Sequence, residues 1–377
     1  MRIAVNTRFL LSSKMEGFGW YTYEVVRRMV QNHPEHTFLF FFDRAYDPSF
    51  LFGNNVQAIV LRPQARHPLL FKYWFNVSVK RALKKYKADV FFSPDGYLSL
   101  TSSVPQIGVI HDINFEHNPQ DIPKGALRYL QHYFPLFARK ANHLLTVSEY
   151  SRQDIARTYH ISEDKITVAW NGASETFQPI DLTARTEVRR KYAEGHPYIL
   201  FVGALHPRKN VGRLIEAFSN YKALRPEDPL RLLIVGEKMF AGQHGHVKIP
   251  AQSASQIHFT GHLPLSELAL VMAAAHLFTF VPYFEGFGIP LVEAMRCGTP
   301  ILAGNKTSLP EVAGDAAIYC DPFSVDDILE KMLFICNNVS ERERLSRLGL
   351  ERSSLFSWDR SAQIAWEVIE RIGNPKD

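Results

Sequence analysis

Cysteine is scarce in this sequence. Among 377 residues there are three, Cys297, Cys320 and Cys336, and no two of them form a CxxC pair. An odd number at these spacings indicates neither a disulfide framework nor a zinc site, and a reducing cytoplasm is the expected compartment. The first residues, 2–6, form a short strand-like run rather than a charged stretch followed by a long apolar core, so we expect no secretory signal.

Long apolar runs and a large excess of charge are also missing. No window reaches the ~18 apolar residues of a membrane span. Lys and Arg number 43 against 38 Asp and Glu, and a net charge of +5 is too mild to indicate a nucleic-acid partner. It suits anionic small molecules or an anionic membrane surface. We therefore expect a cytoplasmic protein that is soluble or lies on the inner face of the cell membrane.

The composition and the length are those of a two-domain globular protein. Hydrophobic residues make up 46% and charged residues 21%, and 377 residues exceed what one hydrophobic core usually holds. Short β-rich runs separated by helix-like stretches occur in two series. They lie at residues 2–6, 37–42, 88–92, 106–110 and 143–147, and then at 198–203, 231–236, 276–281 and 299–303.

Alternation of strands and helices predicts a parallel sheet in each series, so we predict an α/β fold of two Rossmann-like, doubly wound domains facing a cleft. The predicted domains are 1–177 and 196–356, joined by a polar linker at 178–195. A final helix within 357–377 has apolar residues at helical spacing, and its pattern alone fits either domain. Ligands of such sheets bind beyond the carboxyl ends of the strands.

The densest motif is the stretch 283–298, which is typical of a glycine loop that enters a short helix. Pro290 suits the first helical position and Gly298 the position after the end, so we expect a helix of about two turns with Glu293 in or near its first turn. The loop backbone at Gly286, Phe287 and Gly288 offers amide donors to an oxygen-rich ligand. Glu285 and Glu293 would accept hydrogen bonds from hydroxyls, although Glu293 could equally serve to complement the helix dipole.

A second motif follows the strand at 198–203. Gly203 ends that strand, and Arg208 and Lys209 stand before the next helix. Together the two cations could neutralise a diphosphate leaving group as its charge grows. The competing interpretation is a pair of solvated surface cations. Further along, Ser308 and Leu309 precede Pro310, and their amides either hold phosphate or belong to a plain capped helix start.

Two features of the first half point to the same edge of its sheet. Gly17 and Gly19 open a helix soon after the first strand, but Thr22 stands where a dinucleotide fingerprint needs glycine, so NAD binding is disfavoured. His111 directly follows the strand 106–110, where it is either structural or a hydrogen-bond partner of a sugar. Because no third or fourth ligand accompanies His111 and Asp112, we predict no required metal.

Together these motifs resemble glycosyltransferase family 4, the retaining enzymes of the GT-B fold, over nearly the whole chain. The resemblance includes the loop at Gly17 and Gly19, the segments 111–112, 146–151 and 171–172, Gly203 with residues 208–210, and Glu285 with Glu293. The usual paired glycines of the first loop appear here as Glu16 and Gly17.

The resemblance implies a role for each matching residue. Glu285 would bind the donor sugar hydroxyls with the amides of 286–288, and Glu293 the nucleotide ribose. Arg208 and Lys209 would bind the diphosphate, with Gly17 and the amides of 308–309 nearby. His111 would contact the transferred sugar close to the reacting carbon. The final helix would cross back to the first domain.

The implied activity is retaining transfer of a hexose, with mannose favoured, from GDP-mannose or a UDP-hexose to a saccharide or polyprenyl-linked acceptor of envelope polysaccharide such as lipopolysaccharide. The nucleotide sugar is a substrate, and no cofactor is expected. Alternatives are a sugar-nucleotide epimerase, a phosphorylase, for which no pyridoxal lysine is evident, and a non-catalytic bilobed module that binds sugar nucleotides. The basic amphipathic stretch 66–87 is either a core helix with a solvated face or a surface for anionic lipid.

Overall fold

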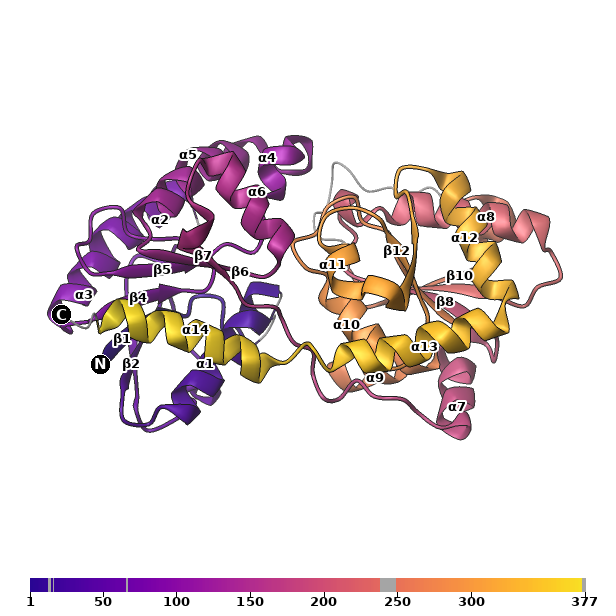
Figure 1. Ribbon diagram of the computed structural model, residues 1–377, viewed down its shortest axis with the longest axis horizontal. Helices are drawn as coiled ribbons and strands as arrows, with labels where there is room; N and C mark the ends of the chain where they lie inside the picture. Colours follow the sequence, from indigo (N-terminus) through magenta and orange to yellow (C-terminus); the bar gives the residue numbers. More distant parts are fainter. Residues whose placement is uncertain (13–14, 16, 66, 238–248, 375–377) are drawn as a thin grey trace. The chain divides into compact units, whose positions relative to one another are not determined.

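The computed structural model describes residues 1–12, 15, 17–65, 67–237 and 249–374. Glu16 of the first glycine loop and Arg66 of the basic stretch lie outside the described residues. The chain divides into two compact units (Figure 1). Unit 1 comprises Met1–Asn171 together with the segment from Ser357, and unit 2 comprises Gly172–Phe356.

Unit 1 is built on a seven-stranded parallel sheet in the order β3-β2-β1-β4-β5-β6-β7. The strands are β1 Arg2–Asn6, β2 Thr37–Phe42, β3 Val56–Val60, β4 Val90–Ser93, β5 Gln106–Val109, β6 His143–Thr146 and β7 Ile166–Val168. Its helices are α1 Gly17–Asn32, α2 Pro68–Tyr73, α3 Lys80–Lys85, α4 Asn114–His117, α5 Lys124–Lys140, α6 Glu149–Tyr159 and α14 Trp358–Gly373. The strand order reverses between β1 and β4, which is where ligands of doubly wound sheets bind.

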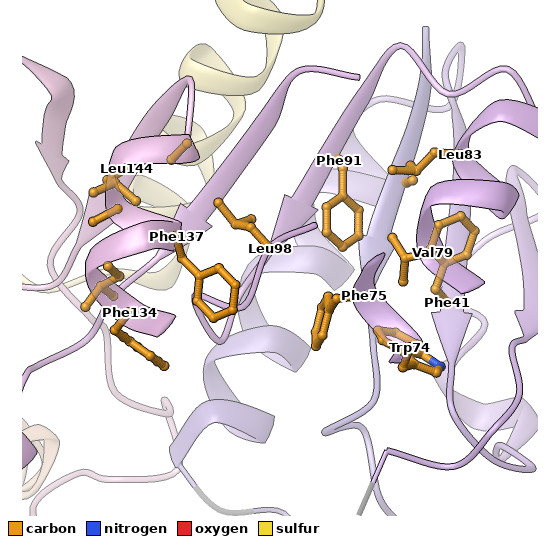
Figure 2. Close-up of a cluster of buried hydrophobic side chains, with 14 of the residues drawn as sticks. Phe41, Trp74, Phe75, Val79, Leu83, Phe91, Leu98, Phe134, Phe137 and Leu144 are labelled. Atoms are coloured by element: carbon orange, nitrogen blue, oxygen red, sulfur yellow. The ribbon is translucent and has the colours of Figure 1, made fainter. Parts of the chain in front are cut away.

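The core of unit 1 is rich in aromatic side chains. Figure 2 shows Phe41 and Phe91 from neighbouring regions of the sheet with Phe75 and Trp74 of the helical segment that follows α2. These side chains are almost completely buried, and Trp74 donates its indole N–H to the Leu61 carbonyl at 3.0 Å. A π-helical turn, Trp74–Val79, joins α2 to α3, so the basic stretch has one face in the core.

Unit 2 repeats the plan with a six-stranded parallel sheet in the order β10-β9-β8-β11-β12-β13. The strands are β8 Tyr198–Val202, β9 Arg231–Val235, β10 Ile257–Gly261, β11 Leu277–Phe280, β12 Ile301–Gly304 and β13 Ala317–Cys320. The helices are α7 Leu182–Ala193, α8 Val211–Leu224, α9 Leu265–Ala274, α10 Ile289–Arg296, α11 Leu309–Ala313, α12 Val325–Asn337 and α13 Val339–Ser353. Two doubly wound α/β units confirm the predicted fold class.

The segment predicted as a linker has structure of its own. Residues 178–195 contain α7, whose N-cap Asp181 accepts a hydrogen bond from the Ala184 amide at 2.8 Å. α7 packs against α9 inside unit 2, with Val188 and Ala193 buried. The division between the units therefore falls after Asn171 rather than at 177. The narrow apolar stripe of α7 among polar residues explains why its composition suggested a linker.

The last helix belongs to unit 1. α14 begins after the N-cap Ser357 and packs against α1, and Figure 1 shows the two helices side by side. Trp366 stacks on His33 with ring centroids 3.6 Å apart, and Arg28 Nε lies 2.7 Å from an Asp359 carboxylate oxygen. This packing assigns α14 to unit 1, a choice that the apolar pattern of the sequence alone did not decide.

Candidate active site

Three charged side chains meet at the carboxyl edge of the unit 2 sheet. Arg208 and Lys209 follow β8, Glu285 follows β11, and these two strands are neighbours where the strand order reverses. Arg208 Nη1 donates to Glu285 Oε1 at 2.8 Å, and Lys209 Nζ donates to the same oxygen. Burial, which leaves Glu285 only 7% exposed, disfavours the carboxylate, but the two cations outweigh this effect and lower its pKa. Glu285 is therefore an ionised acceptor at neutral pH.

The turn that carries the two cations is fixed by its neighbours. Arg208 and Lys209 lie in a single 3₁₀ turn, Pro207–Lys209, whose N-cap His206 accepts from the Arg208 amide at 3.3 Å. Asn210 takes the left-handed conformation and donates its side-chain amide to the carbonyls of Val281 and Pro322. The Lys209 ammonium lies 5.0 Å from the centre of the Phe280 ring. These contacts hold the cations in place, which excludes the interpretation as loose solvated side chains.

Residues at the start of α11 hydrogen-bond to the backbone of the glycine loop. The Ser308 hydroxyl lies 3.0 Å from the Glu285 carbonyl and 3.1 Å from that of Phe287, so it donates to this loop. The Glu285 amide in turn donates to the Thr307 hydroxyl at 3.2 Å. Ser308 is fully buried, and the described contacts give it a positioning role. Direct binding of phosphate by the amides of 308–309 stays a prediction.

Gly288 completes the loop and begins the helix. Its φ of +96° lies in the left-handed region, and a Cβ there would meet a Leu309 methyl carbon at 3.0 Å. α10 then runs over Ile289–Arg296 with Pro290 in its first turn, and Gly298 follows its end with a φ of +65°. The predicted two-turn helix is confirmed.

Glu293 is the fifth residue of α10, just past the first turn and within the expected position in or near that turn. This position removes most of the helix-dipole explanation, because that effect fades within the first turn. The side chain is half-buried, and among the described residues it has no hydrogen-bond or ion-pair partner. Burial raises its pKa to about 8. A partly accessible carboxyl group without a partner is suited to receive hydroxyl donors from a ligand.

A backbone contact that the sequence did not indicate shapes the neighbouring loops. Gly203 and Gly236 directly follow the adjacent strands β8 and β9 and have φ values of +151° and +141°. A Cβ on Gly236 would lie 2.0 Å from the Gly203 carbonyl oxygen. Gly236 is therefore required for close approach of two backbones. The sequence signal for this contact is a glycine after each of two apolar runs, although the expected strand 231–236 included Gly236.

The candidates of unit 1 gather at the start of α1. His111 Nε2 lies 2.9 Å from the Pro94 carbonyl, which requires the proton on Nε2, and the ring meets Phe18 and Tyr21 edge-on. Burial lowers the pKa of His111, so the imidazole is neutral and Nδ1 is an acceptor. Gly17, the first residue of α1, is exposed, whereas a Cβ on Gly19 would lie 2.7 Å from the Phe9 carbonyl. Close packing against Phe9 therefore requires a glycine at position 19, in addition to the ligand role predicted for it.

The described residues also bear on metal binding and on membrane insertion. Among them, no three His, Cys, Asp or Glu side chains are grouped so as to hold a metal ion. The independence from metal and cofactor stays a prediction. None of the described helices has both the length and the apolar character needed to cross a membrane.

Comparison with known proteins defines the class. Residues 15–176 match the pattern described as Glycosyltransferase Family 4, and residues 184–352 match Glycosyl transferases group 1. The fold is shared with WaaG, a glycosyltransferase involved in lipopolysaccharide biosynthesis, at TM-score 0.74 and 18% identity over 97% of this chain and 99% of that one. It is shared with Anabaena HepE in complex with UDP and glucose at TM-score 0.76 and 16% identity over 98% and 99%. The two units therefore form a GT-B glycosyltransferase.

Relatives in sequence place the chain more narrowly. It is 32% identical over 304 residues to the O-antigen chain mannosyltransferase B of Escherichia coli, and the match covers 78% of each protein. It is 30% identical over 248 residues to the E. coli serotype-specific mannosyltransferase WbdA, covering 62% of this chain and 29% of that longer protein. The chain belongs to glycosyltransferase family 4. This membership supports the transferase interpretation, and nothing in the comparisons supports the epimerase, phosphorylase or non-catalytic alternatives.

Proposed function

We propose that the enzyme transfers mannose, with retention of configuration, from a nucleotide-diphosphate sugar to a saccharide or lipid-linked saccharide of envelope polysaccharide. GDP-mannose is the first candidate donor and a UDP-hexose the second. The observation that carries the proposal is the arrangement of Arg208, Lys209 and Glu285, followed in the chain by the helix α10 that bears Glu293. Mannose is supported by the names of three relatives, two from E. coli and the O-antigen chain mannosyltransferase RfbU of Salmonella typhimurium.

In the proposed reaction the bond between the anomeric carbon and the diphosphate oxygen breaks. The acceptor hydroxyl oxygen bonds to that carbon on the same face, and the departing phosphate oxygen takes the acceptor's proton. Arg208 and Lys209 stabilise the negative charge that grows on the diphosphate. Retention without a covalent intermediate fits the site, because the buried Glu285 is occupied by two cations rather than presented as a free nucleophile.

The remaining residues have binding roles in this proposal. Ionised Glu285 accepts hydrogen bonds from the sugar hydroxyls, assisted by the amides of 286–288, and Glu293 accepts from the ribose. The neutral His111 offers Nδ1 to a hydroxyl of the transferred sugar, because Nε2 is committed to the Pro94 carbonyl. Gly17 and the amides of 308–309 are assigned to the diphosphate.

A thermal-shift screen tests the donor assignment. GDP, UDP, GDP-mannose and UDP-glucose are compared at equal concentration, and a ligand present at 100 times its Kd stabilises the folded state by about 2.7 kcal/mol. We expect the guanosine compounds to raise Tm most, and Lys209→Ala to lose most of that rise. A larger rise in Tm with the uridine compounds would make a UDP-hexose the donor instead of GDP-mannose. No rise in Tm with any of the four compounds would contradict the proposal. Anomeric NMR of the glycoside product then reports retention.

We also propose an anionic membrane surface as a partner of unit 1. The stretch after His67 buries Trp74, Phe75 and Val79, yet it leaves Leu69 72% and Tyr73 47% exposed. Exposed cations flank these apolar side chains, and no carboxylate occurs between residues 62 and 88; the cations are Lys72, Lys80, Arg81, Lys84, Lys85 and Lys87. One helical segment thus has a core face and a basic face, so the two sequence interpretations are compatible.

Vesicle flotation tests this partner. We expect binding to vesicles that contain phosphatidylglycerol and little binding to phosphatidylcholine alone. Because each Lys near an anionic surface contributes about 1 kcal/mol, Lys84→Gln with Lys85→Gln should weaken binding by about 30-fold. The control, Lys331→Gln in unit 2, should float like the unaltered enzyme. Equal binding to both kinds of vesicle would contradict an electrostatic surface.

A further inference from the structure

A pocket lies at the amino edge of the unit 2 sheet, opposite the candidate active site. Its volume is about 480 Å³, within the range of small-molecule sites. His276 and Thr299–Pro300 precede β11 and β12, so the wall is formed where these strands begin, whereas Glu285 and Ser308 follow their ends. The other lining residues come from α7, the end of α9, Gly298 and α13.

Cations dominate the lining. Four arginines, Arg185, Arg189, Arg342 and Arg347, face two glutamates, Glu343 and Glu351. Arg347 lies 3.5 Å from Glu351, and both side chains are exposed. Among the described residues, the other three arginines have no carboxylate within ion-pair distance. The inner part of the pocket therefore carries guanidinium charge without a protein counterion.

Helix capping accounts for only part of this cluster. Arg189 Nε donates to the Ala274 carbonyl at the end of α9, and Arg342 Nη1 donates to the last carbonyls of α12. Arg185 makes no such bond among the described residues, and its buried Nε has no hydrogen-bond partner. An unpartnered buried N–H costs about 1–3 kcal/mol. The buried Nε of Arg185 therefore destabilises the fold, and a stabilising role does not explain its position.

The pKa shifts of the pocket's cationic groups show that positive charge there is not balanced by carboxylates. Burial lowers the pKa of Arg189, and neighbouring Arg185 lowers it further. The pKa of His276 falls to about 4 through burial and the charges of Arg342 and Arg189, so this imidazole is neutral and adds no charge of its own. Arg185 and Arg189 stand one turn apart on α7 and present their forks on one face of the helix.

We propose that this pocket binds a phosphate monoester of about the size of a sugar phosphate, at a second ligand site distinct from the candidate active site. Arginine forks match phosphate oxygens bidentately, and Arg185 together with Arg189 supplies them. Ala273, Ala275 and Pro300 give an apolar surface for the carbon skeleton. The inference does not depend on the donor or acceptor proposed above, because none of these residues belongs to that site.

Isothermal titration in a phosphate-free buffer tests the site with mannose 6-phosphate, inorganic phosphate and neutral mannose. We expect the ester to bind more tightly than phosphate, and mannose not to bind at this site. Arg185→Gln should weaken ester binding at least tenfold. Lys209→Ala, in the other site, and Arg190→Gln, an exposed neighbour on α7 outside the lining, should leave it unchanged.

Thermal denaturation separates this role from a structural one. Without ligand, Arg185→Gln should match or exceed the Tm of the unaltered enzyme, because it removes a buried unpartnered N–H and a like charge beside Arg189. With mannose 6-phosphate, only the unaltered enzyme should gain stability. The proposal is overturned if the ester does not bind at 100 times the concentration of protein, if Arg185→Gln binds it normally, or if Lys209→Ala abolishes its binding. Equal affinity for phosphate and the ester would overturn recognition of the sugar.

Discussion

Arg208 Nη1 and Glu285 Oε1 lie 2.8 Å apart, and the ammonium of Lys209 shares the same carboxylate oxygen. One acidic side chain thus orients two cations that the sequence motif placed only side by side in the chain. Arg208 Nη1 also donates to the Phe284 carbonyl at 3.2 Å, so the same carboxylate and loop backbone fix the guanidinium. Each of these side chains therefore both supplies charge and holds the others in place, so a mutation of one is expected to affect catalysis more than folding.

Lys209→Ala should lower kcat by about 10²–10³-fold, because it removes a preorganised cation that faces the growing charge of the leaving group. The change should leave the fold intact, since Arg208 still neutralises Glu285. Steady-state kinetics together with circular dichroism measure the two effects. Lys191→Ala is the matched control, because that exposed lysine pairs with Glu267 elsewhere in unit 2. Turnover within threefold of normal for Lys209→Ala would rule out the assigned role.

Glu293→Gln should increase stability at alkaline pH. The carboxyl group has an ordinary pKa of 4.5 and a pKa of about 8 in the folded protein. Between these values the unfolded chain is ionised while the native state keeps its proton, so stability falls as pH rises from 4.5 to 8. The variant lacks this loss. Urea denaturation should show a gain that is largest at pH 8 and above and absent at pH 4.

The same substitution should weaken nucleotide binding. If the ionised carboxylate accepts the ribose hydroxyls, binding releases a proton, and affinity should rise with pH until about pH 8, the pKa of Glu293. Titration of nucleoside diphosphate from pH 6 to 9 should show this rise for the unaltered enzyme. Glu293→Gln should bind at least tenfold more weakly at pH 8 and show a flat profile. A parallel rise in both proteins would assign the titration to another group.

Gly236→Ala should be severely destabilising, by more than about 3 kcal/mol, because two backbones would have to separate. A Cβ at this position would lie 2.0 Å from the Gly203 carbonyl oxygen. Gly212→Ala in α8 is the control, since a Cβ there meets nothing within 4 Å. It should stabilise the protein by up to about 1 kcal/mol through helix propensity. Thermal denaturation of both variants measures the difference, and equal effects would refute the steric argument.

Trp366→Ala should destabilise unit 1 by about 3–5 kcal/mol, the usual cost of truncating a buried aromatic side chain. Trp366 is 4% exposed and lies on the α14 face that stacks on His33. Trp20→Ala is the comparison, because Trp20 on α1 is 37% exposed and should cost less than about 1 kcal/mol. In urea, the transition of unit 1 should move while that of unit 2 stays. If the unit 2 transition moved instead, the assignment of α14 to unit 1 would be wrong.

Much of the fold was predictable because inner strands of parallel sheets are buried on both faces and form continuous apolar runs. Four strands were not predicted, and they are the edge strands of the two sheets: β3, β7, β10 and β13. Each has residues of intermediate or full exposure, so its apolar run is interrupted. The same cause hid α7, whose few buried side chains lie among exposed polar ones.

The candidate site was predictable to the extent that it follows strand ends. Residues after β8 and β11 had to meet, because the carboxyl ends of parallel strands share one edge. The positioning role of Thr307 and Ser308 was not predictable, since it depends on which carbonyls the folded loop presents. The arginine pocket was hidden for another reason. Arg185 and Arg342 are far apart in the sequence, and their approach depends on how α7 and α13 fold onto one sheet edge.

The return of α14 to unit 1 has a consequence for dissecting the protein. All of unit 2 is one uninterrupted stretch of chain, Gly172–Phe356, whereas unit 1 is assembled from two stretches at opposite ends. A fragment that ends before Ser357 keeps all of unit 2 but uncovers the side of unit 1 where Trp366 and His33 meet. Only unit 2 can be produced separately as a single continuous polypeptide. Unit 1 would need its two stretches joined directly, in place of the whole second unit.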